Sequence, residues 1–229
     1  MLPVAILAGG KATRLGELAR DTPKSLMEIA GRPFAVHQLD LLRRHGLRDV
    51  VYCTGYLGEQ LMAAIGDGSA YGMRVRYSPD GDRALGTGGA IRKAAPLLGP
   101  RFFVLYGDSY LDCDYQAIAQ AFVESTRDGL MTVLCNNGRW DRSNVSYRDG
   151  RIVRYDKANT TPEMQHIDYG LGAFNGHVFE SYPAERAFDL VEVYQGLLAR
   201  NQLAAYEVST RFYEIGGPAG LEETRQHLS

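Results

Sequence analysis

Cysteine and histidine are scarce in this 229-residue sequence, and their placement excludes several kinds of site. The three cysteines, Cys53, Cys113 and Cys135, are widely spaced and include no Cys-x-x-Cys pair for zinc or redox chemistry. We interpret all three as buried thiols. The five histidines include no His-Glu-x-x-His motif, and none has a Cys or His neighbour at ligand spacing. The sequence therefore indicates no zinc site.

An excess of charge of one sign is also missing. Lys and Arg number 25 against 27 Asp and Glu, a formal net charge of −2, so no overall field gathers nucleic acid or an anionic membrane. The sequence has no apolar run long enough to span a membrane and no signal-type N-terminal segment. We therefore expect a cytoplasmic protein with no nucleic-acid or membrane partner, in which any anion site is local.

The composition is that of an ordinary globular protein. Hydrophobic residues make up 45% and charged residues 23% of the chain, and a chain of this length buries about 70% of its unfolded surface on folding. The length allows one large domain or two small ones. No linker or low-complexity segment divides the chain, so we treat residues 1–229 as a single domain.

Short apolar runs alternate with helical patterns through the first half of the chain, as in α/β folds with parallel sheets. The fold class that we expect is α/β, with a Rossmann-like, mostly parallel sheet flanked by helices. The predicted strands are residues 3–8, 49–54, 74–78 and 102–106. The first predicted helix has Pro33 at its first position and is closed by Gly46, and two more span residues 57–65 and 87–98.

The second half departs from this alternation. Two alternating segments between Val145 and Tyr155 flank Asp149-Gly150, a strong hairpin signal. Antiparallel strands here suggest an extension that covers the open end of the parallel sheet. The other predicted strands are residues 130–135, 170–174, 204–208 and 212–215, and the predicted helices are residues 115–126, 188–201 and 218–228.

Glycines and basic residues follow the first predicted strand. Gly9 and Gly10 come directly after it, and Arg14 and Lys24 lie further along the same loop. Backbone N–H groups of glycines can approach a phosphate closely, and the two side chains add positive charge. The loop is neither a Walker A motif nor Gly-x-Gly-x-x-Gly. A tight turn at the glycines and a solvated surface amine at Lys24 are the plain alternatives.

Two further clusters follow later strands and, together with the first, resemble a known family. Residues 7–15 (LAGGKATRL), 21–24 (DTPK) and 26–33 (LMEIAGRP) resemble the signature of the sugar-1-phosphate nucleotidyltransferases. The segments LGTGGAI, which begins at Leu85, and YGD, which ends at Asp108, have the order and spacing of that family. One departure is Ala12, where the family usually has glycine.

The resemblance implies transfer of a nucleotidyl group from a nucleoside triphosphate to a sugar 1-phosphate, with release of pyrophosphate. Such an in-line displacement needs alignment and charge neutralisation rather than a protein nucleophile. The catalytic residues that the resemblance implies are Arg14, which would hold the departing pyrophosphate, and Lys24, which would contact the α-phosphate. The residues that we expect to bind the nucleotide are Leu7, Ala8, Gly9, Gly10, Asp82, Gly86, Thr87 and Gly88. Thr87 and Gly88 would suit the base and ribose because small residues let a flat base lie on the backbone.

Two acidic residues are the candidates for a metal site, which we expect to hold Mg²⁺, with Mn²⁺ able to substitute. Asp108 stands at a strand end, where a carboxylate can hold Mg²⁺ between phosphates or else cap the next turn. The family has a second acidic ligand late in the chain, in an Asp-x-Gly segment, and Glu214 stands in its place here.

The sugar phosphate is expected to bind to the second half of the chain. Asp156-Lys157 resembles the Glu-Lys element of the family, in which the lysine contacts the sugar phosphate, and a solvated lysine is the alternative. Tyr169 and Gly170 lie where the family has small residues that face the sugar, so Tyr169 suggests an unusual sugar pocket unless it is a core residue. Residues 1–110 would mainly bind the nucleotide, and residues 111–229 mainly the sugar phosphate.

The base and the sugar are less constrained by the sequence. The compact length is similar to that of short guanylyltransferases acting on heptose or mannose 1-phosphate, and to that of short uridylyltransferases. Asp80 and Asp82 could accept hydrogen bonds from guanine or from uracil. We favour GTP with a heptose or hexose 1-phosphate. The alternatives are a uridylyl- or cytidylyltransferase acting on another sugar phosphate or a non-sugar phosphate, and an inactive regulatory module that binds nucleotide sugars. A homo-oligomer is left open.

Overall fold

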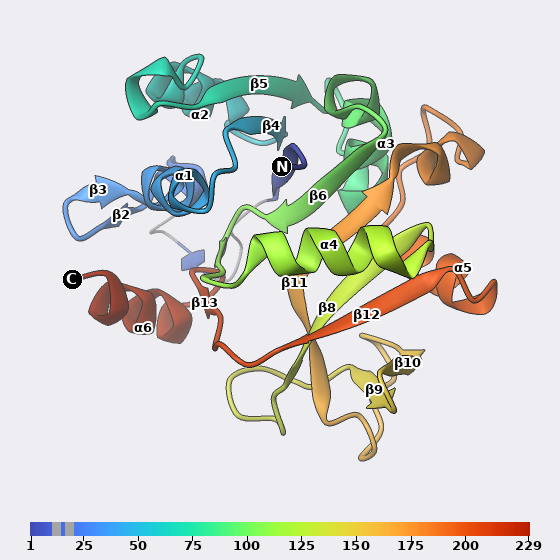
Figure 1. Cartoon of the computed structure of the whole chain (residues 1–229). Helices are drawn as coiled ribbons and strands as arrows, with labels where there is room; N and C mark the ends of the chain where they lie inside the picture. Colours follow the sequence, from blue (N-terminus) through green and yellow to red (C-terminus); the bar gives the residue numbers. More distant parts are fainter. Residues whose placement is uncertain (11–14, 17–20) are drawn as a thin grey trace.

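The first half of the chain forms a parallel sheet in the computed structural model, which describes every residue except 11–14 and 17–20 (Figure 1). Its strands, in spatial order, are β6 (Arg101–Tyr106), β1 (Val4–Ala8), β4 (Asp49–Thr54) and β5 (Arg74–Pro79). Val4 and Ile6 in the central strand are fully buried, because helices cover both faces of the sheet. The predicted α/β fold with a mostly parallel sheet is confirmed.

Antiparallel strands from the second half extend this sheet beyond β6. Asp149 and Gly150 both have positive φ, 51° and 75°, as a two-residue type I′ hairpin turn requires. The predicted hairpin and the antiparallel extension are therefore present. β11 (His166–Asn175) pairs antiparallel with β6 and with β8 (Gly129–Cys135), β12 (Leu203–Val208) pairs parallel with β8, and β9 (Val145–Arg148) forms the hairpin with β10 (Arg151–Tyr155).

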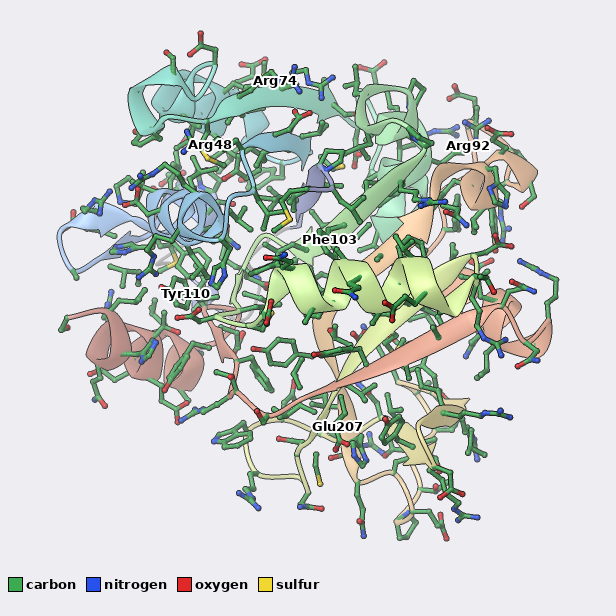
Figure 2. The ribbon with its side chains drawn as sticks, viewed as in Figure 1. Arg48, Arg74, Arg92, Phe103, Tyr110 and Glu207 are labelled. Carbon is green, nitrogen blue, oxygen red and sulfur yellow. The ribbon has the colours of Figure 1, made fainter. Side chains whose placement is uncertain are left out.

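Helices cover the two faces of the sheet and give each face its own hydrophobic core. Side chains alternate along each strand, so that Ile6 belongs to one core and its neighbour Ala5 to the other. Phe103 of β6, labelled in Figure 2, packs edge to face on Tyr115 at the start of the helix that lies in front of the sheet in Figure 1. The first face packs on α1 (Phe34–Arg44), α2 (Gly58–Ile65) and α4 (Tyr115–Ser125), and the second on α3 (Gly86–Leu98) and α5 (Leu190–Ala199).

Short elements bring the end of the chain to the carboxyl end of β6. Tyr213 lies opposite Tyr110 in a two-stranded pair, and Glu214 lies opposite Ser109. The last helix follows directly and packs in a small third core with Phe34 and Ile215. The elements are β7 (Ser109–Tyr110), β13 (Tyr213–Glu214), α6 (Pro218–Leu228), the pair β2 (Glu28–Ile29) and β3 (Arg32–Pro33), and the 3₁₀ turns η2 (Lys24–Leu26), η3 (Ser69–Tyr71) and η4 (Gly176–Ser181).

Some sequence-based predictions need correction. Cys53 and Cys113 are buried, but Cys135 is exposed, because it ends β8 where the strand leaves the covered part of the sheet. The helix predicted from residue 188 begins at Leu190, since the Asp189 carboxylate accepts a hydrogen bond from Val191 N at 2.8 Å and caps it. In the part of the chain that the structure describes, no helix is long and apolar enough to cross a membrane.

Candidate active site

The loops that follow β1, β4, β5 and β6 surround a cavity of about 610 Å³ at the carboxyl edge of the sheet. This is the edge at which open α/β sheets bind ligands. The structure here brings together residues that are distributed over the whole first half of the sequence. Of the residues predicted to bind nucleotide, metal or phosphate, those that line this cavity are Leu7, Ala8, Gly9, Gly10, Lys24, Asp82, Gly86, Thr87 and Asp108.

Gly9 is required by a close approach of two loops. A Cβ on Gly9 would lie 3.2 Å from Gly55 N, and a Cβ on Gly55 would lie 2.8 Å from Gly9 O. The loops after β1 and β4 therefore touch backbone to backbone. A Cβ on Gly10 would meet nothing within 4 Å among the described residues. The backbone of Gly10 is thus open on that side, as a phosphate-binding amide would need.

The start of α3 forms another wall of the cavity. Gly86 has a φ of 70°, which glycine adopts without strain, and Thr87 Oγ1 accepts a hydrogen bond from Leu190 N at 2.7 Å. Gly88 does not line the cavity; a Cβ there would collide with the ring of Phe188. The small size of Gly88 lets the start of α3 pack on Phe188, which lies before α5, and this corrects our expectation that Gly88 leaves room for a base.

Asp80 and Asp82 have different surroundings. The Asp80 carboxylate accepts a hydrogen bond from Leu85 N at 3.1 Å and supports the loop before α3, and burial raises its pKa. Asp82 is exposed on the wall of the cavity. Tyr56, 44% exposed, lines the same cavity and was missed by the sequence analysis. Its position directly after β4 is the signal that could have identified it.

Lys24 and Asp108 form an ion pair between two of the predicted clusters. Lys24 Nζ lies 2.8 Å from Asp108 Oδ2, and both side chains are only partly exposed, 18% and 28%. The pair links the loop after β1 to the end of β6. Arg14, the second predicted catalytic cation, lies outside the described residues.

Asp108 and Glu214 approach the same small space around Gly216. A Cβ on Gly216 would lie 3.3 Å from Asp108 Oδ2 and would collide with Glu214 Oε2. The backbone fixes this arrangement, since Ile215 N donates to Asp108 O at 2.9 Å. The described residues contain no group of three or more His, Cys, Asp or Glu side chains suited to a metal ion. Two carboxylate groups facing one space nevertheless fit Mg²⁺, which commonly takes one or two carboxylates and completes its shell with phosphate and water oxygens.

A second cavity, of about 350 Å³, adjoins the first and shares Tyr106 and Asp108 with it. The predicted residues Lys157, Tyr169 and Gly170 line this second cavity, together with Glu214. Lys157 Nζ lies 3.4 Å from Asp168 Oδ2 and 5.2 Å from the centroid of the Tyr106 ring. Asp168 also lines this cavity, and the sequence analysis did not assign it a role although it lies between predicted residues.

The ring of Tyr169 belongs to the hydrophobic core. Its residue is 2% exposed, and the ring packs edge to face on Phe212 with centroids 6.3 Å apart. Tyr169 also lines the second cavity, beside Asp168 and Gly170. Because only 2% of the residue is exposed, most of its ring serves the core, and a contact of Tyr169 with a sugar stays a prediction.

Comparison with known proteins identifies the family of the chain. Residues 4–144 match the family described as nucleotidyl transferase, and the chain belongs to that family. Among its relatives is the N-acetylmuramate alpha-1-phosphate uridylyltransferase of Neisseria meningitidis, 30% identical over 226 residues, with 96% of this chain and 95% of the relative covered. The D-glycero-alpha-D-manno-heptose 1-phosphate guanylyltransferase of Campylobacter jejuni is 25% identical, with 93% and 94% covered.

A solved structure supports the fold. A putative glucose-1-phosphate thymidylyltransferase from Bacillus anthracis superimposes with a TM-score of 0.87 at 20% identity, with 99% of this chain and 95% of that chain covered. At this identity the likeness establishes the fold alone. The family resemblance stated from the sequence is confirmed by the family match and the relatives.

Proposed function

We propose that the protein transfers a nucleotidyl group from a nucleoside triphosphate to a sugar 1-phosphate, giving a nucleoside diphosphate sugar and pyrophosphate. The observation that carries this proposal is the pair of cavities that meet at Tyr106 and Asp108. The first is lined by described residues up to position 108 and the second by described residues from position 106 onward. This supports a nucleotide-binding role for residues 1–110 and an acceptor-binding role for residues 111–229.

In the proposed reaction a phosphate oxygen of the sugar 1-phosphate attacks the α-phosphorus, and the bond from that phosphorus to the pyrophosphate oxygen breaks. Lys24, on the wall of the first cavity, stabilises negative charge at the α-phosphate. Lys157, on the wall of the second, binds the phosphate of the acceptor. Arg14 is assigned to the departing pyrophosphate on the family resemblance. Alignment of two anions is the main task of the site, as expected for phosphoryl-type transfer.

Asp108 and Glu214 are the residues that would hold Mg²⁺, or Mn²⁺ in its place. A hard cation bound there supplies positive charge between the phosphate groups. Gly216 keeps the space between the two carboxylates open.

We propose GTP as the preferred donor. Asp82 is an exposed carboxylate in the first cavity, and a carboxylate can accept hydrogen bonds from both N1–H and the amino group of guanine. Relatives named guanylyltransferases agree with this choice. UTP is the second candidate, because the relative that is 30% identical along nearly its whole length is named a uridylyltransferase. As acceptor we propose a heptose or hexose 1-phosphate, bound in the cavity of about 350 Å³.

These assignments are tested by measuring pyrophosphate release. Each of the four common ribonucleoside triphosphates is combined with heptose, mannose, glucose and N-acetylmuramate 1-phosphates. The highest kcat/KM is expected for GTP with a heptose or hexose 1-phosphate. A preference for UTP would refute the guanylyl assignment. Binding of nucleotide sugars without turnover of any pair would instead favour an inactive regulatory module.

A further inference from the structure

Asp168 is a nearly buried carboxylate beside the second cavity. Its side chain is 3% exposed. Oδ1 accepts a hydrogen bond from Gly170 N at 3.1 Å, and Oδ2 accepts one from the Tyr155 hydroxyl at 2.9 Å. Its backbone N–H is fixed as well, donating to Asn144 Oδ1 at 2.9 Å. A buried carboxylate is costly unless it is paired, so a fold that retains one here must give it partners.

The cationic partner is Lys157, which has little else to hold it. Lys157 follows β10 in a bend, outside any helix or strand, and its flexible side chain does not fix the position of the ammonium group. Nζ lies 3.4 Å from Asp168 Oδ2 and 3.4 Å from the Tyr106 hydroxyl oxygen. The rings of Tyr106 and Tyr155 lie 5.2 and 5.8 Å from Nζ, within cation–π range.

The acidic neighbour of Lys157 in the sequence cannot replace Asp168. Asp156 Oδ1 accepts hydrogen bonds from Ala158 N at 3.0 Å and from Asn159 N at 2.8 Å, and Oδ2 accepts one from Arg154 at 3.1 Å. Asp156 thus closes the turn after β10 and is directed away from the ammonium group of Lys157.

We propose that Asp168 is a positioning residue that fixes the Lys157 ammonium group, as a cation, at the acceptor cavity. This inference rests on the proposed function, because it assigns to the fixed cation the phosphate of a sugar 1-phosphate. Both oxygens of Asp168 already have partners in Gly170, Tyr155 and Lys157, so we assign it no direct contact with the acceptor. It acts through the position and the charge of Lys157.

Protonation of Lys157 follows from the same contacts. Burial has the largest single effect and lowers the pKa of Lys157, but Asp168, Tyr106 and Asp189 together outweigh it and raise the pKa above its usual value. The titratable groups around it are Asp168 on β11, Tyr106 on β6, Tyr155 on β10 and Asp189 before α5. Replacing Asp168 by asparagine removes the negative charge that opposes the effect of burial on the pKa of Lys157. The pKa of Lys157 then falls, and the cation is lost as the pH rises.

Initial rates with both substrates varied, from pH 6.5 to 9.5, test the proposal in the wild type and in Asp168→Asn. The variant is expected to raise KM for the sugar 1-phosphate about tenfold and to leave KM for the triphosphate within about twofold. Its kcat/KM for the sugar 1-phosphate should also fall at alkaline pH relative to the wild type. Asp49→Asn is the control, because it makes the same change of charge at a carboxylate that pairs with Arg74 and Arg76 at the start of β4, away from both cavities; it should alter neither readout.

Two further variants keep the proposal falsifiable if Asp168→Asn is unstable. Asp168→Glu retains the charge and shifts the ammonium group, so it should raise KM for the acceptor without the alkaline loss. Asp168→Asn should add less than about twofold to the defect of Lys157→Ala, because both changes remove one interaction. Wild-type acceptor kinetics in a folded Asp168→Asn or Asp168→Glu variant would overturn the role of Asp168 and leave the proposed function standing. A wild-type enzyme that turns over no sugar 1-phosphate would overturn the proposed function instead.

Discussion

Lys24 is the residue whose charge the proposed chemistry needs most directly. It lies in the nucleotide cavity and pairs with Asp108 at 2.8 Å. Lys24→Ala should lower kcat by about 10²-fold or more, because one charge aimed at the transferring group contributes on the order of 3 kcal/mol to the transition state. A partly exposed ion pair contributes only about 0–1 kcal/mol to folding. Calorimetry should therefore show a small change in Tm, and near-normal turnover in the folded variant would remove Lys24 from the catalytic residues.

Gly216 offers a test of the metal site that replaces neither Asp108 nor Glu214. A Cβ on Gly216 would enter the space between Asp108 and Glu214, whereas a Cβ on Gly217 would meet nothing within 4 Å among the described residues. Gly216→Ala should therefore raise the Mg²⁺ concentration for half-maximal activity by about tenfold, a difference of about 1.4 kcal/mol. Gly217→Ala, the control, should resemble the wild type. Equal Mg²⁺ dependence in the two variants would place the cation elsewhere.

Tyr169 lines the acceptor cavity but is only 2% exposed, so its variants test whether it serves the core or the choice of sugar. Its buried hydroxyl has no hydrogen-bond partner among the described residues, so Tyr169→Phe should leave the free energy of unfolding unchanged or raise it by about 1 kcal/mol. Tyr169→Ala should cost about 3–5 kcal/mol by opening a cavity in the core. Denaturant titration checks both values. Altered preference among sugar phosphates in Tyr169→Phe would contradict the core assignment.

At the scale of elements, the start of α3 depends on Gly86. Gly86 and Gly99, at the two ends of this helix, both have positive φ, 70° and 84°. A Cβ on Gly86 would collide with Phe188 O, and one on Gly99 would meet nothing within 4 Å among the described residues. Gly99→Ala should cost about 1–3 kcal/mol from backbone strain alone, because Gly99 has φ 84° and ψ −166°, a conformation almost restricted to glycine. Gly86→Ala should cost about 1–3 kcal/mol more and raise KM for the triphosphate. Equal losses of stability would refute the role of this contact.

The elements also show which parts of the fold could be predicted from the sequence. β1, β4 and β6 are largely apolar runs followed by glycine, and β1 and β4 were predicted to within a residue because local pattern determines them. The pairing of β13 with β7, which brings Glu214 beside Asp108, joins segments that are far apart in the sequence. The contact of Gly88 with Phe188 is likewise a tertiary contact that no local pattern encodes. The sequence analysis assigned no role to Asp168, because that role depends on a contact with Lys157, which follows a different strand.

At the scale of the whole molecule, the fold joins two halves at one strand. β6 pairs with β1 in the parallel part and with β11 in the antiparallel extension. The nucleotide cavity and the acceptor cavity therefore share the end of β6, at Tyr106 and Asp108. Two anions bound in these cavities would meet beside Asp108, which is what an in-line transfer between them requires.

The measurement that tests this account most directly is the formation of pyrophosphate by the purified protein, with each substrate and Mg²⁺ omitted in turn. We predict pyrophosphate and a nucleoside diphosphate sugar in equal amounts only when a nucleoside triphosphate, a sugar 1-phosphate and Mg²⁺ are all present. Pyrophosphate release that does not require the sugar 1-phosphate, or the absence of release with every pair of substrates, would contradict the account.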